Sequence, residues 1–101
     1  MNAPKQLSPD QAKAKILQIV ETGRIVPTWY HGQKRMNQRD VTEDDIREAL
    51  TNGEIKRPAE WDDRYNNWKY RVEGIDLEGE ELRVITIIIE QDHKLRILSV
   101  F

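Results

Sequence analysis

The 101-residue sequence contains no cysteine, so neither disulfide bonds nor thiolate metal ligands can support its fold. It also lacks a long hydrophobic run, because the longest, residues 84–89, is interrupted by Thr86 and is far too short to cross a bilayer. The first eight residues have no apolar stretch of the kind that secretion signals carry. We therefore expect a cytoplasmic protein that does not enter the membrane and that is stabilised by packing.

Several catalytic signatures are also missing. The sequence has no glycine-rich phosphate loop and no Ser-x-Gly nucleophile elbow. Its two histidines, His31 and His93, lie in distant segments and show no local metal-ligand spacing. We predict no metal site and no cofactor.

The composition indicates one small domain that spans residues 1–101, because halves of this chain would be too small to bury a core of their own. Hydrophobic residues make up 38% of the chain and charged residues 34%. The formal net charge of −2 argues against indiscriminate binding to nucleic acid. A basic patch, if one exists, has to be local.

Helix signals fill the first half of the chain. Ser8 as N-cap, Pro9 at the first position and Gln11 in a capping box predict a helix over about residues 9–22, with Gly23 as a left-handed stop. A polar second helix is predicted over residues 28–39, and a third begins after Thr42 and ends at residues 52–53. On the first helix the apolar residues share one face, and the lysines at positions 13 and 15 fall on the other.

Strand signals fill the second half. Residues 68–73 alternate between aromatic or apolar and charged side chains, residues 82–90 are apolar on both alternations, and residues 95–101 form the last strand. Short connections require antiparallel pairing. The predicted fold class is α+β, with three N-terminal helices packed on a three- to four-stranded antiparallel sheet. The predicted core contains Ile16, Ile19, Val20, Ile46, Leu50, Val84, Ile88 and Ile97.

The strongest candidate site is a cationic stripe on the predicted second helix. His31, Arg35 and Arg39 are spaced by four residues, so a helix places them on one face, with Lys34 beside them. The arginines could hold a phosphodiester while His31 transfers a proton near neutral pH. The alternative is a solvated helix face whose arginines pair with nearby carboxylates.

Lys69 and Arg71 share the charged face of the predicted strand, and Tyr70 points to the other side. These two cations either bind the flanking phosphates of RNA or lie on an open sheet face without a ligand. Trp29, Trp61 and Trp68 could stack on bases, but we expect two of the three at the core or its edge.

Residues 30–101 resemble the bacterial domain of unknown function 4258. The resemblance rests on His31-Gly32-x-x-Arg35-Met36-x-x-Arg39, on the run from Val41 to Gly53, on Lys69-Tyr70-Arg71-Val72 and on the ending Ser99-Val100-Phe101. This chain carries Gly32 where the family prefers Ala and Asp40 where Gly is usual. The N-terminal helical part of the chain is also similar to that of motility quorum-sensing regulator toxins.

The resemblance implies a fold like that of RelE-type messenger-RNA-cleaving toxins and a cognate antitoxin as partner. The first hypothesis is therefore a metal-independent endoribonuclease in which His31 is general acid or base and Arg35 and Arg39 stabilise the transition state. The chain has more acidic than basic residues, whereas such ribonucleases are usually basic. The rival hypothesis is a non-catalytic interaction module that pairs through an exposed strand edge with a second copy or another protein.

Overall fold

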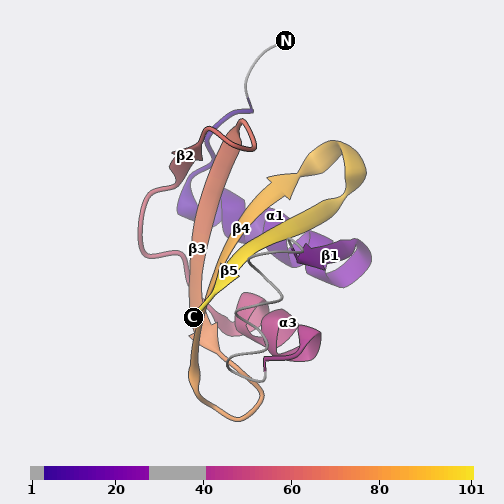
Figure 1. The fold of residues 1–101 in the computed structure, drawn as a ribbon, viewed down its shortest axis with the longest axis vertical. Helices are drawn as coiled ribbons and strands as arrows, with labels where there is room; N and C mark the ends of the chain where they lie inside the picture. Colours follow the sequence, from indigo (N-terminus) through magenta and orange to yellow (C-terminus); the bar gives the residue numbers. More distant parts are fainter. Residues whose placement is uncertain (1–3, 28–40) are drawn as a thin grey trace.

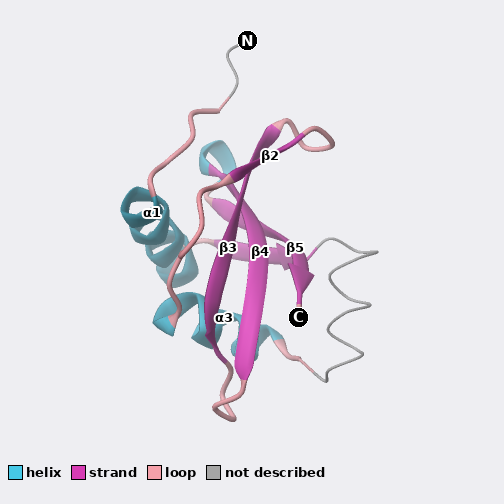
Figure 2. Ribbon diagram, turned by 90° about the vertical axis from the view of Figure 1, so that its left-hand side faces the viewer, coloured by secondary structure: helices cyan, strands magenta, loops and turns pink. Residues whose placement is uncertain are grey.

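The computed structural model describes residues 4–27 and 41–101. These residues form a five-stranded sheet with the strand order β1-β5-β4-β3-β2. Figure 2 shows α1 and α3 on the same side of the sheet. The elements, in chain order (Figure 1), are α1 (Pro9–Thr22), β1 (Arg24–Pro27), α3 (Glu43–Asn52), β2 (Glu60–Asp62), β3 (Asn67–Ile75), β4 (Glu81–Ile89), the 3-10 turn η1 (Glu90–Asp92) and β5 (Lys94–Val100).

The predicted fold class is wrong in its count of elements and in its sheet type. The described residues form two α-helices on a five-stranded mixed sheet, not three helices on a three- to four-stranded antiparallel sheet. Strands β2 to β5 pair antiparallel with their neighbours, but β1 adds to β5 in parallel. The segment predicted as the second helix lies outside the described residues.

Gly23 explains how the parallel strand is added. It was expected to end α1 in a left-handed conformation, yet its φ of −109° and ψ of −152° are extended. A side chain at this position would meet the carbonyl oxygen of His93. The absence of a Cβ lets the end of α1 approach the β4–β5 turn, where Arg24 N donates to His93 O at 3.2 Å. The chain therefore enters the sheet beside β5.

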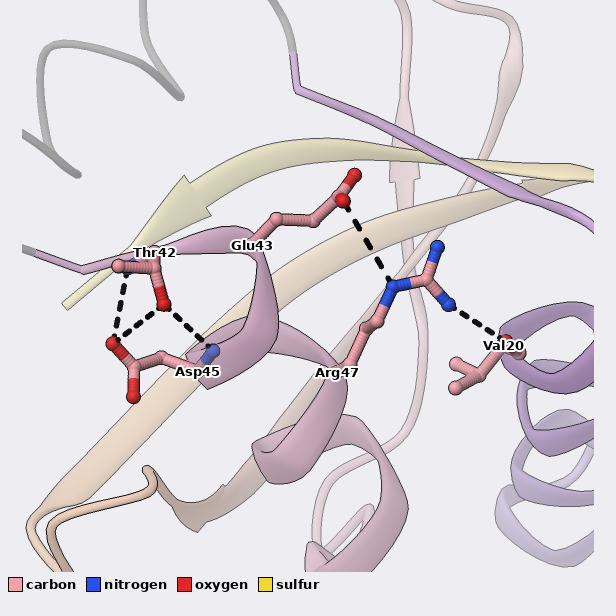
Figure 3. A network of polar contacts seen from close by, with 5 residues as sticks. All are labelled: Val20, Thr42, Glu43, Asp45 and Arg47. Atoms are coloured by element: carbon pink, nitrogen blue, oxygen red, sulfur yellow. Dashed lines mark hydrogen bonds and ion pairs between the residues drawn. The ribbon is translucent and has the colours of Figure 1, made fainter.

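Both described helices begin as their sequences predict. Ser8 Oγ accepts a hydrogen bond from Gln11 N, and Gln11 Oε1 accepts one from Ser8 N, which completes a capping box. Thr42 and Asp45 form the same arrangement at the start of α3 (Figure 3). These hydrogen bonds join residues that are close in the sequence, so the start of each helix does not depend on tertiary contacts.

Polar contacts also join α3 to its neighbours. Arg47 Nη1 donates to the carbonyl oxygen of Val20 at 2.8 Å, and its Nε lies 3.9 Å from Glu43 Oε2 (Figure 3). Asp45 Oδ1 accepts from Leu77 N in the β3–β4 turn at 3.1 Å. The N-terminus of α3 is thus tied to the sheet, and its side is tied to the end of α1.

The hydrogen bonds of Asp45 make the free energy of unfolding depend on pH in the acid range. Its hydrogen bonds from Thr42 N and Leu77 N hold its pKa below the ordinary value of 3.8. A carboxyl with a lowered pKa in the folded state stabilises the fold above its unfolded-state pKa, and this contribution is lost as the pH falls through the folded-state pKa. As the pH falls below the ordinary carboxyl value of 3.8, the Asp45→Asn variant is therefore expected to lose less stability than the unmodified protein.

This expectation is checked by urea unfolding at neutral pH and at an acid pH below the ordinary carboxyl pKa. Asp44→Asn is the matched control, because Asp44 is an exposed residue in the same first turn. Equal pH dependence in the unmodified protein and in Asp45→Asn would contradict the role given to Asp45.

The core lies between the two helices and one face of the sheet. Of the eight residues predicted for it, seven are buried in one cluster, and Val20 packs against that cluster while partly exposed. This prediction is confirmed. β4 lies at the centre of the sheet, and its buried side chains include Ile87 on the face away from the helices, as the apolar run predicted. In the part of the chain that the structure describes, no helix is long and apolar enough to cross a membrane.

Candidate functional site: a cationic sheet face

The face of the sheet that points away from the helices carries most of the strand cations. Strand alternation turns Tyr70 and Val72 into the core and Lys69 and Arg71 to the opposite face, as predicted. The pairing registers place Arg83 on β4 and two residues of β5 on this same outer face. Strands β3, β4 and β5 together contribute five cations there, namely Lys69, Arg71, Arg83, Lys94 and Arg96.

The same alternation places only two carboxylates of these three strands, Glu73 and Glu81, on the outer face. On these three strands the five cations therefore outnumber the acids, although the whole chain has a net charge of −2; the β2–β3 register adds two more carboxylates, Glu60 and Asp62, to the same face. In the parallel register, Arg24 of β1 lies beside Lys94 and extends the same face. This set of cations is called the cationic face below.

Arg71 has an unusual environment within the cationic face. Its Nη2 lies 3.9 Å from Glu73 Oε1, and its guanidinium carbon lies 5.1 Å from the centre of the Phe101 ring. Its Nε is buried and has no hydrogen-bond partner. A buried N–H without an acceptor is costly, so this part of the Arg71 side chain adds no hydrogen bond to the stability of the fold.

Lys69 lies closer to the edge of the sheet. Its Nζ is 3.8 Å from Asp62 Oδ2 on the neighbouring strand β2. About a third of its side chain is exposed, so this ion pair is weak and open to exchange with a ligand anion.

A cavity of about 590 Å³ opens beside Lys69 and Arg71. Its lining includes Ile85, Leu98 and Ser99 from β4 and β5, and most residues of the segment 57–65 also line it; this segment is called the cavity wall below. That wall contributes cationic, acidic and aromatic side chains, which are Arg57, Arg64, Glu60, Asp62, Asp63, Trp61 and Tyr65. The volume lies in the range of small-molecule sites, and the lining offers both charge and ring surfaces.

The aromatic residues divide between the core edge and the surface. Trp68 packs against the core, and its Nε1 donates to the carbonyl oxygen of Pro4 at 2.9 Å. Trp61 is 36% exposed and meets the Trp68 ring edge-on at a centroid distance of 5.3 Å. Trp29 lies outside the described residues, so the expectation for two of the three tryptophans remains a prediction.

Sequence reasoning missed four members of the cationic face, namely Arg24, Arg83, Lys94 and Arg96. Arg83 lies over the Phe101 ring, and Arg96 lies over the Tyr65 ring, each with its guanidinium carbon 5.5 Å from the ring centre. Alternation along β4 alone would have found Arg83. Alternation along β5 would likewise have found Arg96, which lies between the buried residues Leu95 and Ile97.

The other candidate residues, His31, Lys34, Arg35 and Arg39, lie outside the described residues. Their predicted roles are therefore untested. Within residues 4–27 and 41–101, no group of three or more His, Asp or Glu side chains is placed to hold a metal ion.

Comparison with known proteins gives one match. The family model described as a domain of unknown function, DUF4258, matches residues 30–101, which include α3 and strands β2 to β5. No curated protein and no solved structure matches the chain. The likeness to RelE-type and motility regulator toxins therefore stays an expectation from the sequence. Because the family model covers well over half of the chain, the protein belongs to DUF4258, a family defined by a domain of unknown function.

Proposed function

We propose that this domain binds single-stranded RNA on its cationic face. The observation that carries the proposal is the gathering of Lys69, Arg71 and Arg83 on one sheet face, where Lys69 and Arg71 line a cavity that also includes the partly exposed Tyr65. Guanidinium and ammonium groups bind the phosphates of a nucleic acid, and aromatic rings accept its unstacked bases. A cavity of this size suits one nucleotide better than a duplex groove.

The proposal extends to cleavage of the bound RNA without a metal ion, as the toxin of a bacterial toxin–antitoxin pair. In this step His31 removes the proton of a ribose 2′-hydroxyl, whose oxygen attacks phosphorus while the 5′-oxygen leaves with a proton from a general acid or water. Arg35 and Arg39 stabilise the additional negative charge on the phosphoryl oxygens. The products are a 2′,3′-cyclic phosphate and a 5′-hydroxyl end. Support for this step is the spacing of these three residues in the sequence.

Replacing Lys69 by alanine is expected to weaken binding of a short single-stranded RNA by about 1 to 3 kcal/mol and to lower the salt dependence of the affinity, because one phosphate contact is lost. Fluorescence anisotropy at several salt concentrations measures both. Lys15→Ala is the matched control, since Lys15 lies on α1 on the other side of the sheet. Equal affinity for the Lys69 and Lys15 variants would contradict the proposal.

Arg35→Ala separates a binding role from a structural one. If Arg35 contacts RNA, its loss is expected to weaken binding by about 1 to 3 kcal/mol and to leave the unfolding temperature nearly unchanged. If Arg35 instead pairs with a buried carboxylate, its loss destabilises the domain by several kcal/mol. RNA titration and thermal unfolding of the same variant distinguish the two.

Cleavage is tested by induced expression in a bacterial host, with growth and bulk messenger RNA followed over time. Growth arrest with loss of messenger RNA is expected for the unmodified chain and not for His31→Ala. The ends of the RNA fragments identify the reaction. Continued growth with intact messenger RNA would overturn the catalytic part of the proposal.

A second candidate is a protein-interaction module, favoured by the mixed charge of the cavity wall, where Glu60, Asp62 and Asp63 stand beside the cations. Exposed Trp61 and arginine side chains are also frequent at protein interfaces. Among the described residues, the short strands β1 and β2 are the two edges of the sheet, where a second copy or an antitoxin could add a strand. Sedimentation showing a dimer, together with no RNA affinity in the titrations above, would favour this candidate.

A further inference from the structure

Two arginines of the cationic face converge on one carboxylate oxygen. Arg71 Nη2 and Arg83 Nε each lie 3.9 Å from Glu73 Oε1. Both guanidinium groups also lie over the ring of Phe101. The three charged side chains come from adjacent strands, because Glu73 and Arg83 are direct partners in the β3–β4 register.

The backbone holds Glu73 firmly in this position. Its N–H donates to Glu54 O at 2.9 Å and its carbonyl accepts from Glu54 N at 3.0 Å, while β4 pairs on its other side. The strand therefore fixes the direction in which the carboxylate projects.

The contacts from the arginines are nevertheless loose. A distance of 3.9 Å is within the range of ion pairs but too long for a hydrogen bond, so Glu73 is not hydrogen-bonded to either guanidinium group through these atoms. The buried Nε of Arg71 has no hydrogen-bond partner at all. An oxyanion that approaches from solvent can accept hydrogen bonds from the exposed parts of both guanidinium groups, which Glu73 does not do.

We propose that Arg71 and Arg83 form a site for one backbone phosphate of the bound RNA, and that Glu73 is a built-in competitor for that site. This inference rests on the proposed RNA binding and names the residue that limits it. Glu73 holds the two like-charged arginines together when no ligand is bound, and it repels the phosphate that approaches them. The second carboxylate near Arg83, Glu81, lies 3.7 Å from Arg83 Nη2 with an 82% exposed side chain, so solvent screens its effect on the phosphate.

The test is an affinity measurement on Glu73→Gln with the same single-stranded RNA and with inorganic phosphate as competitor. Glutamine keeps the length of the side chain and removes its charge. The affinity for RNA is expected to rise about five- to tenfold at low salt, and a lower phosphate concentration should then displace the RNA. Glu78→Gln is the charge-matched control, because Glu78 is exposed in the β3–β4 turn.

A double-mutant cycle assigns the effect to the arginine pair. Arg83→Ala in the Glu73→Gln background is expected to remove the gain in affinity, whereas Arg24→Ala should leave most of it. Unfolding of each variant in urea is followed in parallel, so that a change in affinity is compared only among folded proteins.

The outcomes separate this inference from the proposed function. If the unmodified chain binds RNA and Glu73→Gln binds it no more tightly than Glu78→Gln, the competitor role is wrong and RNA binding stands. A gain that survives Arg83→Ala also overturns the arginine-pair site. If neither the unmodified chain nor Glu73→Gln binds RNA, both the proposed function and the inference fail.

Discussion

Replacing Ile88 by alanine is expected to lower the free energy of unfolding by about 2 to 5 kcal/mol. Ile88 is only 6% exposed, belongs to the core cluster and pairs with Leu95 across the β4–β5 ladder. The truncation removes buried methyl and methylene groups and leaves a cavity that two helices and a sheet cannot easily close. Urea unfolding measures the loss directly.

Ile75→Ala is the control for this substitution. Ile75 is 45% exposed at the end of β3, so the same chemical change is expected to cost less than about 0.5 kcal/mol. A similarly small loss for Ile88→Ala would mean that β4 is displaced by one residue, which would turn its core side chains to the other face.

Replacing Lys13 by methionine is expected to lower the free energy of unfolding by about 2 to 3 kcal/mol. Lys13 Nζ donates to the carbonyl oxygens of Leu50 at 2.7 Å and Thr51 at 3.0 Å, and also to that of Gly53. Helix α3 has no basic residue in its last turn, so this lysine of α1 provides the cation that its C-terminal carbonyls favour.

The expected loss is smaller than the sum of three charged hydrogen bonds, because folding also dehydrates the ammonium group. Burial lowers the pKa of Lys13, and the nearby carboxylate of Glu54 opposes that shift. Methionine keeps the apolar stem and removes the donor. Lys15→Met is the control, since Lys15 lies on the same helix without these contacts to α3, and a loss for Lys13→Met equal to that control would disprove the capping role.

Lys13 also shows where helical periodicity is insufficient. The spacing placed it on the polar face of the first helix, which is correct for a helix considered alone. Its long side chain nevertheless reaches the end of α3, because α1 and α3 lie side by side on the sheet. No property of residue 13 in the sequence indicates that contact.

The sequence by itself determined the local structure and the composition of the core. Ser8 with Gln11 and Thr42 with Asp45 start the two described helices through hydrogen bonds between neighbours in the chain. Alternation along β3 determined that Lys69 and Arg71 face away from Tyr70, since successive strand side chains point to opposite faces. These features need only short-range geometry; the two N-caps, the Ser8–Gln11 capping box and the strand alternation were predicted, and the Thr42–Asp45 box was not.

Only the tertiary structure decided the sheet order and the extent of the cationic face. The parallel pairing of β1 with β5 depends on the approach of Gly23 to His93, two residues 70 positions apart in the sequence. The meeting of Arg71 and Arg83 at Glu73 depends on the β3–β4 register, and the pairing of Arg96 with Ile87 depends on the β4–β5 register. Strand propensity is local, whereas register and neighbour choice are set by contacts between distant segments, so these arrangements could not be derived from the sequence pattern.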